Sequence, residues 1–182
     1  IVSIILGIIM IALDQLVKYW TVTSLKPKGS IDFLHIGKFD IMDLTYVEND
    51  GAIFGSMSGQ RWFLIGFPLL IIAAGIFVLI KYRKRSKLLN VAVFLFVIGG
   101  IGNLIDRIRV GYVIDMFDLQ LFEFAVFNVA DIYVTVAMFL LIFYAFFIDP
   151  KIEKKIKAAE EVKEQRKIGN RGFTGRSRSK SR

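Results

Sequence analysis

Four long apolar segments, separated by polar stretches, dominate the pattern of this chain. They cover residues 1–20, 62–80, 88–107 and 126–148, and each approaches the roughly 20 residues that a helix needs to cross a bilayer. The pattern predicts an all-α membrane protein with four transmembrane helices in one domain, residues 1–148. A cleaved signal peptide is the alternative for the first segment, but a small-residue cleavage pattern is missing and its last turns are polar, which favours a retained helix.

The polar stretch between the first two segments, residues 21–61, contains two short runs with a different pattern. Residues 31–36 and 39–47 alternate apolar and polar positions in the way that half-buried strands do. We therefore expect a small β-like cradle between helices 1 and 2. Residues 108–125, between helices 3 and 4, are expected to form a loop.

Charge sets the expected orientation. Hydrophobic residues make up 55% of the chain and its mean hydropathy is +0.57, which agrees with a membrane protein. Of the formal net charge of +8, most lies in residues 149–182, and residues 81–87 carry five basic residues and no acid. Because basic flanks mark the cytoplasmic side, we expect a multi-pass protein with both termini in the cytoplasm and residues 21–61 and 108–125 outside.

Residues 149–182 are expected to form a basic cytoplasmic tail. They contain twelve Lys or Arg and five Asp or Glu. Residues 151–168 could form a polar helix, and the Arg-, Ser- and Gly-rich end is expected to be disordered. An alternative role for this tail is an arm that docks on nucleic acid or the ribosome. We nevertheless expect that the protein has no nucleic-acid partner.

The charged residues inside the apolar segments all fall near the expected outer surface. An Asp at bilayer depth costs about 3 kcal/mol on insertion scales, so Asp131, within an otherwise apolar run, indicates a function. The outer ends of helices 1, 3 and 4 and the adjoining loop carry Asp14, Lys18, Asn103, Asp106, Arg107, Asp115, Asn128 and Asp131. This convergence predicts a polar site at one membrane surface.

Helical spacing pairs several of these side chains. Asp14 and Lys18 stand at i and i+4, with the acid first, which is the favourable order for a helical ion pair. Asn128 and Asp131 stand at i and i+3 and project from one helix face. Two hypotheses stay open for Arg107: its planar guanidinium could clamp a carboxylate or a carbonyl, or it could extend to the lipid headgroups.

The available side chains favour acid–base chemistry by carboxylates. The chain has no Cys and a single His, His35, so a zinc site is improbable, and no metal or cofactor is expected. Two neighbouring carboxylates share a proton, and such a pair activates water in aspartic proteases. Three acids, Asp106, Asp115 and Asp131, could supply the pair, and spacing does not choose between them. A small proton- or cation-coupled transporter using the same carboxylates is the alternative.

Five motifs, in order along the chain, resemble those of the bacterial lipoprotein signal peptidase (signal peptidase II) family. They are Asp14-Gln-Leu-Val-Lys18, Asn49-Asp-Gly-Ala-Ile-Phe-Gly55, Gly99-Gly-Ile-Gly-Asn-Leu-Ile-Asp-Arg107, Gly111-Tyr-Val-Ile-Asp115 and Phe127-Asn-Val-Ala-Asp131. The resemblance spans residues 14 to 144 and leaves the basic tail outside.

The resemblance implies roles for individual residues. It assigns the catalytic pair to Asp115 and Asp131 and makes Asp106 a structural acid. The supporting positions would be Asp14, Lys18, Asn49, Asn103, Arg107 and Asn128. The implied enzyme is a monomeric aspartic endopeptidase of the bacterial cytoplasmic membrane, surrounded by phospholipid, with its site near the outer leaflet. Its implied substrates are prolipoproteins, cleaved immediately before a Cys that carries diacylglycerol.

Overall fold

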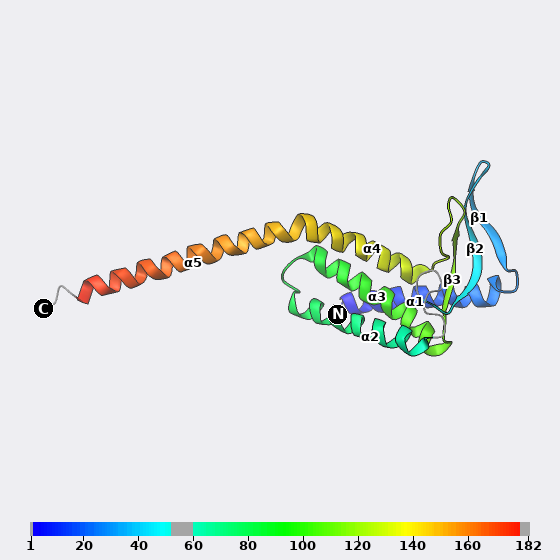
Figure 1. Ribbon diagram of the computed structural model, residues 1–182, viewed down its shortest axis with the longest axis horizontal. Coiled ribbons are helices and arrows are strands. Elements are labelled where there is room, and N and C mark those ends of the chain that lie inside the picture. Colours follow the sequence, from blue (N-terminus) through cyan, green and yellow to red (C-terminus); the bar gives the residue numbers. More distant parts are fainter. Residues whose placement is uncertain (1, 52–59, 179–182) are drawn as a thin grey trace. The chain divides into compact units, whose positions relative to one another are not determined.

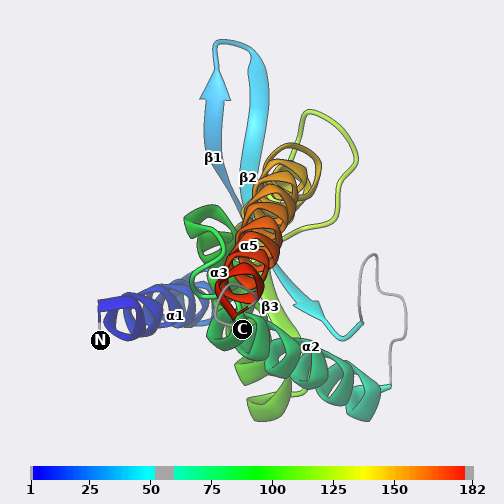
Figure 2. The ribbon, with the colours of Figure 1, turned by 90° about the vertical axis from the view of Figure 1, so that its left-hand side faces the viewer.

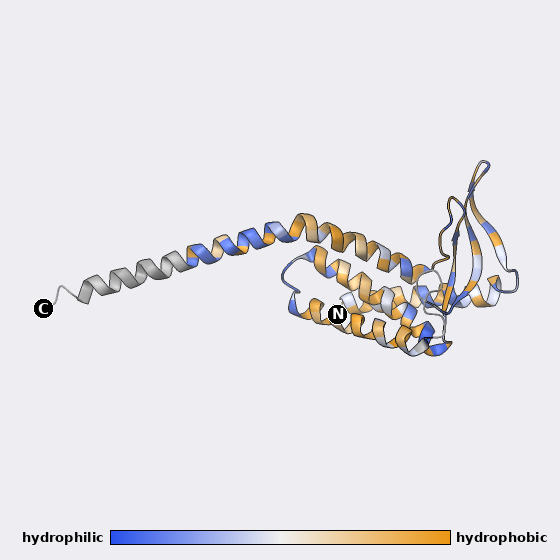
Figure 3. Ribbon diagram, viewed as in Figure 1, coloured by the Kyte–Doolittle hydropathy of each residue, from blue (hydrophilic) through white to orange (hydrophobic). Residues whose placement is uncertain are grey.

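A computed structural model describes residues 2–51 and 60–178 of the chain. Four helices in it are long and apolar enough to span a membrane, and the spanning stretches are residues 2–25, 62–81, 87–109 and 129–163. They contain helices α1 (Val2–Trp20), α2 (Arg61–Lys81), α3 (Lys87–Arg109) and α4 (Val129–Phe143). The hydropathy of these helices is high over most of their length (Figure 3). The expected four-helix membrane fold is therefore confirmed.

Large apolar side chains cover the outer faces of the helices. Ile8, Leu70 and Phe139, for example, are 62%, 70% and 70% exposed. In water such surfaces would be costly, whereas lipid tails solvate them without penalty. Helix α2 lies along α3 in both views (Figures 1 and 2), and the short turn between them carries the basic residues 81–87.

A three-stranded antiparallel sheet lies at one end of the helices (Figure 1). Strands β1 (Ser30–Ile36) and β2 (Phe39–Asn49) form a hairpin that turns at Gly37, whose φ of 64° suits glycine. Strand β3 (Val113–Leu119) pairs with β2. The two strands expected between helices 1 and 2 are present. The loop expected at residues 108–125 is wrong in part, because its middle is β3.

The alternation of apolar and polar residues did not predict strand β3, because both faces of the strand are covered at its start. Val113, Ile114, Asp115 and Met116 are all buried, so the run shows no alternation of apolar and polar residues. Its pairing partner, β2, is also far away in the sequence. The cradle is therefore built from two separate parts of the chain.

A small core joins the sheet to the end of α1. After Trp20 the chain continues as a short π-helix, η1 (Thr21–Leu25), and Leu25 is fully buried against Leu44 of β2 and Ile114 and Met116 of β3. This apolar cluster fixes β3 over the polar end of the helices and so sets the position of Asp115.

Glycines let three helices meet below the sheet. A Cβ added to Gly99 of α3 would lie 2.5 Å from the backbone oxygen of Ala130, and one added to Gly102 would lie 2.7 Å from an oxygen of Asp14. Small residues permit such close helix contacts in membrane proteins. The N-terminus of α4, the end of α3 and the polar part of α1 therefore share one junction.

The C-terminal residues, from Ile142 on, form a separate compact unit. It contains a π-helical turn, η3 (Tyr144–Ile148), and helix α5 (Asp149–Arg178). The Tyr144 hydroxyl donates a hydrogen bond to Asp149 at 2.5 Å. The polar helix expected over residues 151–168 is present and continues to Arg178. Disorder was expected for residues 169–182, but residues 169–178 belong to α5. For residues 179–182, which lie outside the described residues, it stays a prediction.

Candidate active site

The N-terminus of α4 carries a reciprocal capping arrangement that fixes Asp131. The backbone N–H of Asp131 donates to Asn128 Oδ1 at 3.0 Å, and the backbone N–H of Asn128 donates to Asp131 Oδ2 at 3.2 Å. This is the geometry of a capping box, with Asn at the cap and an acid three residues later. The i, i+3 pair in the sequence is therefore also the helix start.

Asp14 of α1 completes this cap from another helix. Its Oδ1 accepts the backbone N–H of Ala130 at 2.9 Å. The first turn of a helix leaves its N–H groups without partners inside the helix and has a partial positive charge. Asp14 therefore anchors α4 to α1 through a buried, charge-assisted hydrogen bond.

The second oxygen of Asp131 is held from α3. Asn103 Nδ2 donates to Asp131 Oδ1 at 2.7 Å. The Oδ1 of Asn103 accepts from Lys18 Nζ at 3.0 Å and from Asn128 Nδ2 at 3.1 Å. Because both of these neighbours are donors, the amide of Asn103 must turn its NH2 group toward Asp131.

Asp115 reaches the same cluster from strand β3. Asn128 Nδ2 donates to its Oδ1 at 2.6 Å, and Asn49 Nδ2 donates to its Oδ2 at 2.9 Å. Asn128 thus contacts both Asp115 and Asp131. Asn49 is oriented in turn by the backbone N–H of Gly51, which donates to its Oδ1 at 3.2 Å.

Burial raises the pKa of Asp115 to about 6, since its side chain is only 1% exposed. The amides of Asn49 and Asn128 lower this pKa by stabilising the charged form, and the negative charge of Asp131 raises it. Asp115 therefore exchanges its proton close to neutral pH.

A second group of charges lies beside this pair and is joined by two ion pairs that share one lysine. Lys18 Nζ lies 3.0 Å from Asp14 Oδ2 and 2.7 Å from Asp106 Oδ2, and all three side chains are at most 1% exposed. The i, i+4 ion pair expected between Asp14 and Lys18 is confirmed. Asp106 takes part in this group, away from Asp131.

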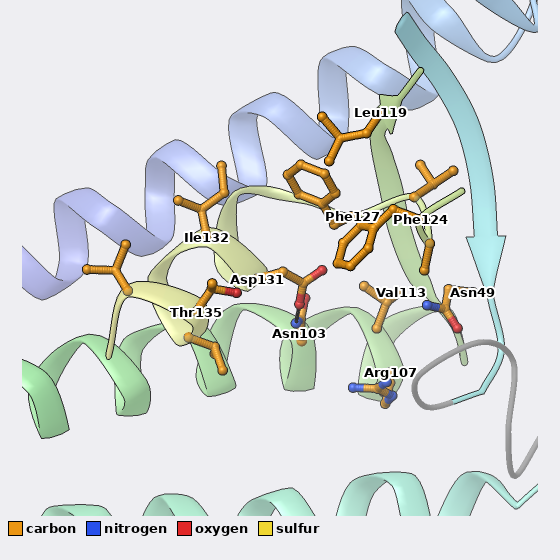
Figure 4. A pocket seen from close by; sticks show the side chains of 14 residues that line it. Asn49, Asn103, Arg107, Val113, Leu119, Phe124, Phe127, Asp131, Ile132 and Thr135 are labelled. Carbon is orange, nitrogen blue, oxygen red and sulfur yellow. Dashed lines mark hydrogen bonds between the residues drawn. The ribbon is translucent and has the colours of Figure 1, made fainter. Parts of the chain in front are cut away.

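Arg107 turns toward the site. Its Nη2 donates to the backbone oxygen of Gly51 at 3.0 Å, and its Nε is buried without a hydrogen-bond partner among the described residues. Figure 4 shows its side chain near the end of α3, below Asn49. The contact agrees with the hypothesis that Arg107 clamps a carbonyl. The remainder of the Asn49–Gly55 motif, residues 52–55, lies outside the described residues.

A cavity of about 690 Å³ opens beside Asp131 (Figure 4). Its walls are mostly apolar and include Phe124, Phe127 and Ile132, with Asn103 and Arg107 as polar members. A smaller cavity of about 190 Å³ reaches Asp115, and the two share lining from Asn49, Ala125 and Val126. The two acids thus face adjoining spaces of which the larger is suited to an apolar ligand.

Gln15 belongs to this cluster, although the sequence analysis assigned it no role. Its Nε2 lies 3.1 Å from Asp14 Oδ2, 3.1 Å from Asp106 Oδ1 and 3.3 Å from the backbone oxygen of Gly102. A polar amide in an apolar segment, next to Asp14, is the signal that could have revealed it.

The fold and this site define a class of protein: a helical, multi-pass membrane enzyme whose polar cluster lies at one end of its helices. The sequence profile of the family described as signal peptidase (SPase) II matches residues 6–147. The chain belongs to the signal peptidase II family, so it is a bacterial membrane protease of the type suggested by the five motifs.

Curated relatives agree with this assignment. A lipoprotein signal peptidase of Streptococcus thermophilus is 41% identical over 133 residues, covering 73% of this chain and 84% of the relative. A lipoprotein signal peptidase of Streptococcus pyogenes is 40% identical over 135 residues, covering 74% and 86%.

Solved structures share the fold. A bacterial membrane enzyme determined by the in meso method at 2.3 Å superimposes with a TM-score of 0.70 and 29% identity, covering 82% of this chain and 89% of the other. A second, at 1.9 Å, gives a TM-score of 0.68 and 28% identity, covering 81% and 94%.

Proposed function

We propose that this chain cleaves the signal peptides of diacylglyceryl-modified prolipoproteins immediately before the lipidated Cys, with Asp115 and Asp131 as its catalytic acids. One observation carries the proposal. Two buried carboxylates, from β3 and α4, are held by a shared amide, Asn128, and adjoin an apolar cavity. Family membership supports the type of reaction.

In the proposed mechanism the two acids share one proton. The ionised acid takes a proton from a water molecule, whose oxygen attacks the carbonyl carbon of the scissile peptide bond. The protonated acid donates its proton to the carbonyl oxygen, and collapse of the tetrahedral intermediate releases the amine of the lipidated Cys, which receives a proton from the pair.

We assign the protonated role to Asp115 and the base role to Asp131. The pKa of Asp115, raised to about 6 by burial, supports a proton on this residue. Asp131 lies at the N-terminus of α4, where the helix dipole suits an anion. The amides of Asn49, Asn103 and Asn128 would hold both carboxylates in place throughout.

Substrate binding would use the larger cavity and the lipid around it. Phe124, Phe127 and Ile132 offer an apolar surface to the signal peptide. The Nε of Arg107, which has no partner among the described residues, would donate to a peptide carbonyl. The diacylglyceryl chains would hold the substrate in the outer leaflet, so that the scissile bond arrives at the depth of the acids. This requires both termini in the cytoplasm, as the basic residues 81–87 suggest.

Reconstitution with a lipidated precursor tests the proposal. Asp115→Asn and Asp131→Asn are each expected to lower the cleavage rate by about 10³-fold or more, since each removes one half of an acid–base pair. Asp118→Asn is the matched control: it lies on β3 with Asp115, accepts a hydrogen bond from Thr45, and is expected to keep full activity. Full activity of either test variant would refute the assignment.

Two further measurements separate this proposal from the other hypotheses. A chelator is expected to leave cleavage unchanged, and inhibition by it would point to a metal site. The transport hypothesis has no support from the family. It would require proton or cation flux into liposomes that depends on Asp131, without proteolysis.

A further inference from the structure

Lys18 is the most completely buried cation of the described residues, and every one of its three N–H groups has an acceptor. These are Asp106 Oδ2 at 2.7 Å, Asp14 Oδ2 at 3.0 Å and Asn103 Oδ1 at 3.0 Å. An ammonium with 0% exposure is stable only with such complete pairing. Its three partners make further hydrogen bonds to different parts of the site.

One path runs from Lys18 to Asp131. The ammonium donates a hydrogen bond to the side-chain oxygen of Asn103. The NH2 group of Asn103 therefore faces Asp131 Oδ1, at 2.7 Å. An amide side chain can rotate by half a turn at little cost when its neighbours do not distinguish its oxygen from its nitrogen. Lys18, together with Asn128 Nδ2 at 3.1 Å, removes that freedom, so that a donor faces Asp131.

A second path runs from Lys18 to Asp115. The Oδ2 of Asp106 also accepts the backbone N–H of Ile114, at 3.4 Å, and Ile114 is the residue next to Asp115. The backbone oxygen of Asp106 accepts the N–H groups of Val110 and Gly111, at 2.8 and 3.3 Å. Asp106 therefore organises the turn from α3 into β3, where Gly111 has a φ of 96°.

Gln15 joins the two acids that flank Lys18. Its single NH2 group lies 3.1 Å from an oxygen of Asp14 and 3.1 Å from an oxygen of Asp106. A neutral double donor at this place reduces the repulsion between two carboxylates that share one cation. Asp14, in turn, caps α4 at Ala130.

We propose that Lys18, Asp106 and Gln15 form a buried network that positions both catalytic acids, and that the charge of Lys18, balanced against Asp14 and Asp106, sets the pH range in which the pair works. Lys18 and Asp106 are positioning residues here, acting through Asn103 and Ile114. The inference rests on the proposed function, which supplies the catalytic role of Asp115 and Asp131.

Charge balance gives the network a signature that packing alone would not give. The charged groups around the pair are Asp14 and Lys18 from α1, Asp106 and Arg107 from α3, and Glu48 and Asp50 at the end of β2, which line the smaller cavity with Asp115. The positive charge of Lys18 lowers the pKa of Asp115. Removing Lys18 should therefore raise that pKa, whereas removing the negative charge of Asp106 should lower it.

The test compares Lys18→Met, Asp106→Asn and the double variant Lys18→Met/Asp106→Asn in the full-length protein. Each is expected to lower kcat at least 100-fold with little change in KM, because the acids lose their alignment. The basic limb of the pH–rate profile should move up by about one pH unit in Lys18→Met and down in Asp106→Asn. The double variant has the same net charge as the wild type. Its basic limb should therefore lie at the wild-type pH again, while kcat stays low.

The exposed Lys26→Met is the matched control for loss of a lysine. Lys26 is 49% exposed and pairs with Glu48 on the surface, so neither kcat nor the pH profile should change. Equal shifts in the same direction for Lys18→Met and Asp106→Asn, or no shift in either, would refute the inference. If Lys18→Met does not fold, the direction of the shift in Asp106→Asn decides.

An infrared titration separates the inference from the proposed function. The carboxylic-acid band that disappears in Asp115→Asn belongs to Asp115, and its midpoint can be followed in each variant without substrate. Opposite displacements of this midpoint support the network even if the wild type fails to cleave prolipoprotein. An unmoved midpoint contradicts the network even if cleavage is normal.

Discussion

Two pairs of aspartates lie at the same end of the helices and have opposite surroundings. Asp14 and Asp106 share the ammonium of Lys18 at 3.0 and 2.7 Å. Asp115 and Asp131 receive hydrogen bonds from amide groups, and among the described residues no cation lies within ion-pair distance of them. The first pair therefore shares one buried cation, whereas the second is held by neutral donors.

This difference explains how one cluster combines rigidity with reactivity. A carboxylate that pairs with a buried lysine is held by a charge-assisted hydrogen bond, and removing it leaves the lysine with one partner fewer. A carboxylate held by neutral amides keeps its hydrogen bonds in either protonation state, because an amide N–H can donate to a carboxyl oxygen as well as to a carboxylate oxygen. We expect the first pair to determine stability and the second to determine chemistry.

The largest effect on stability is expected for Asp14→Ala. The change leaves Lys18 with one anion fewer and the N–H of Ala130 without its partner, and breaking a buried ion pair costs about 3–5 kcal/mol. Thermal unfolding in detergent would measure the loss. Asp131→Asn, as the contrasting variant, should unfold close to the wild type, and equal destabilisation by the two would remove the distinction between the pairs.

Asp115, a member of the second pair, should make the stability of the folded protein depend on pH. The pKa of Asp115 is about 6 in the folded protein and 3.8 as the ordinary value, so between these pH values the folded state binds more protons than the unfolded state. The free energy of unfolding therefore decreases as pH rises from about 4 to 6, by roughly 3 kcal/mol from this group. Thermal unfolding across this range should be flatter in Asp115→Asn, and parallel curves would contradict the raised pKa.

The junction below the two pairs should tolerate no added methyl group. Gly102→Ala would place a Cβ 2.7 Å from Asp14 Oδ2 and 3.0 Å from the Cβ of Ala130, and overpacking of this kind costs about 1–3 kcal/mol. Gly66→Ala is the control on α2, since its added Cβ meets nothing within 4 Å. A Gly102→Ala variant as stable as Gly66→Ala would show that the helices can move apart there.

The smallest effect is expected for the exposed ion pair of Lys26 and Glu48. Their nitrogen–oxygen distance of 2.8 Å is similar to that between Lys18 and Asp106, but the two side chains are 49% and 41% exposed. Because water solvates both charges in the absence of the partner, Lys26→Ala should leave the unfolding temperature unchanged within error. A clear loss would mean that distance, and not burial, decides the value of a pair in this protein.

The features that depend on the spacing of residues along one helix could be predicted from the sequence. The four spanning helices follow from runs of apolar residues, and the pairing of Asp14 with Lys18 follows from their i, i+4 spacing. The spacing of Asn128 and Asp131 predicted a shared face, and the structure adds that the pair starts α4. Hydropathy and charge bias also placed the charged residues of the apolar segments at one end without any knowledge of contacts.

Tertiary structure decided which acids lie together. Asp106 and Asp115 are equally plausible partners for Asp131 on spacing alone, and the family resemblance was needed to prefer Asp115. The separation comes from the pairing of β3 with β2 and the burial of Ile114 and Met116 against Leu25, which bring Asp115 to Asn128 and leave Asp106 with Lys18. Contacts between segments so distant in the chain have no local pattern, and only packing produces them.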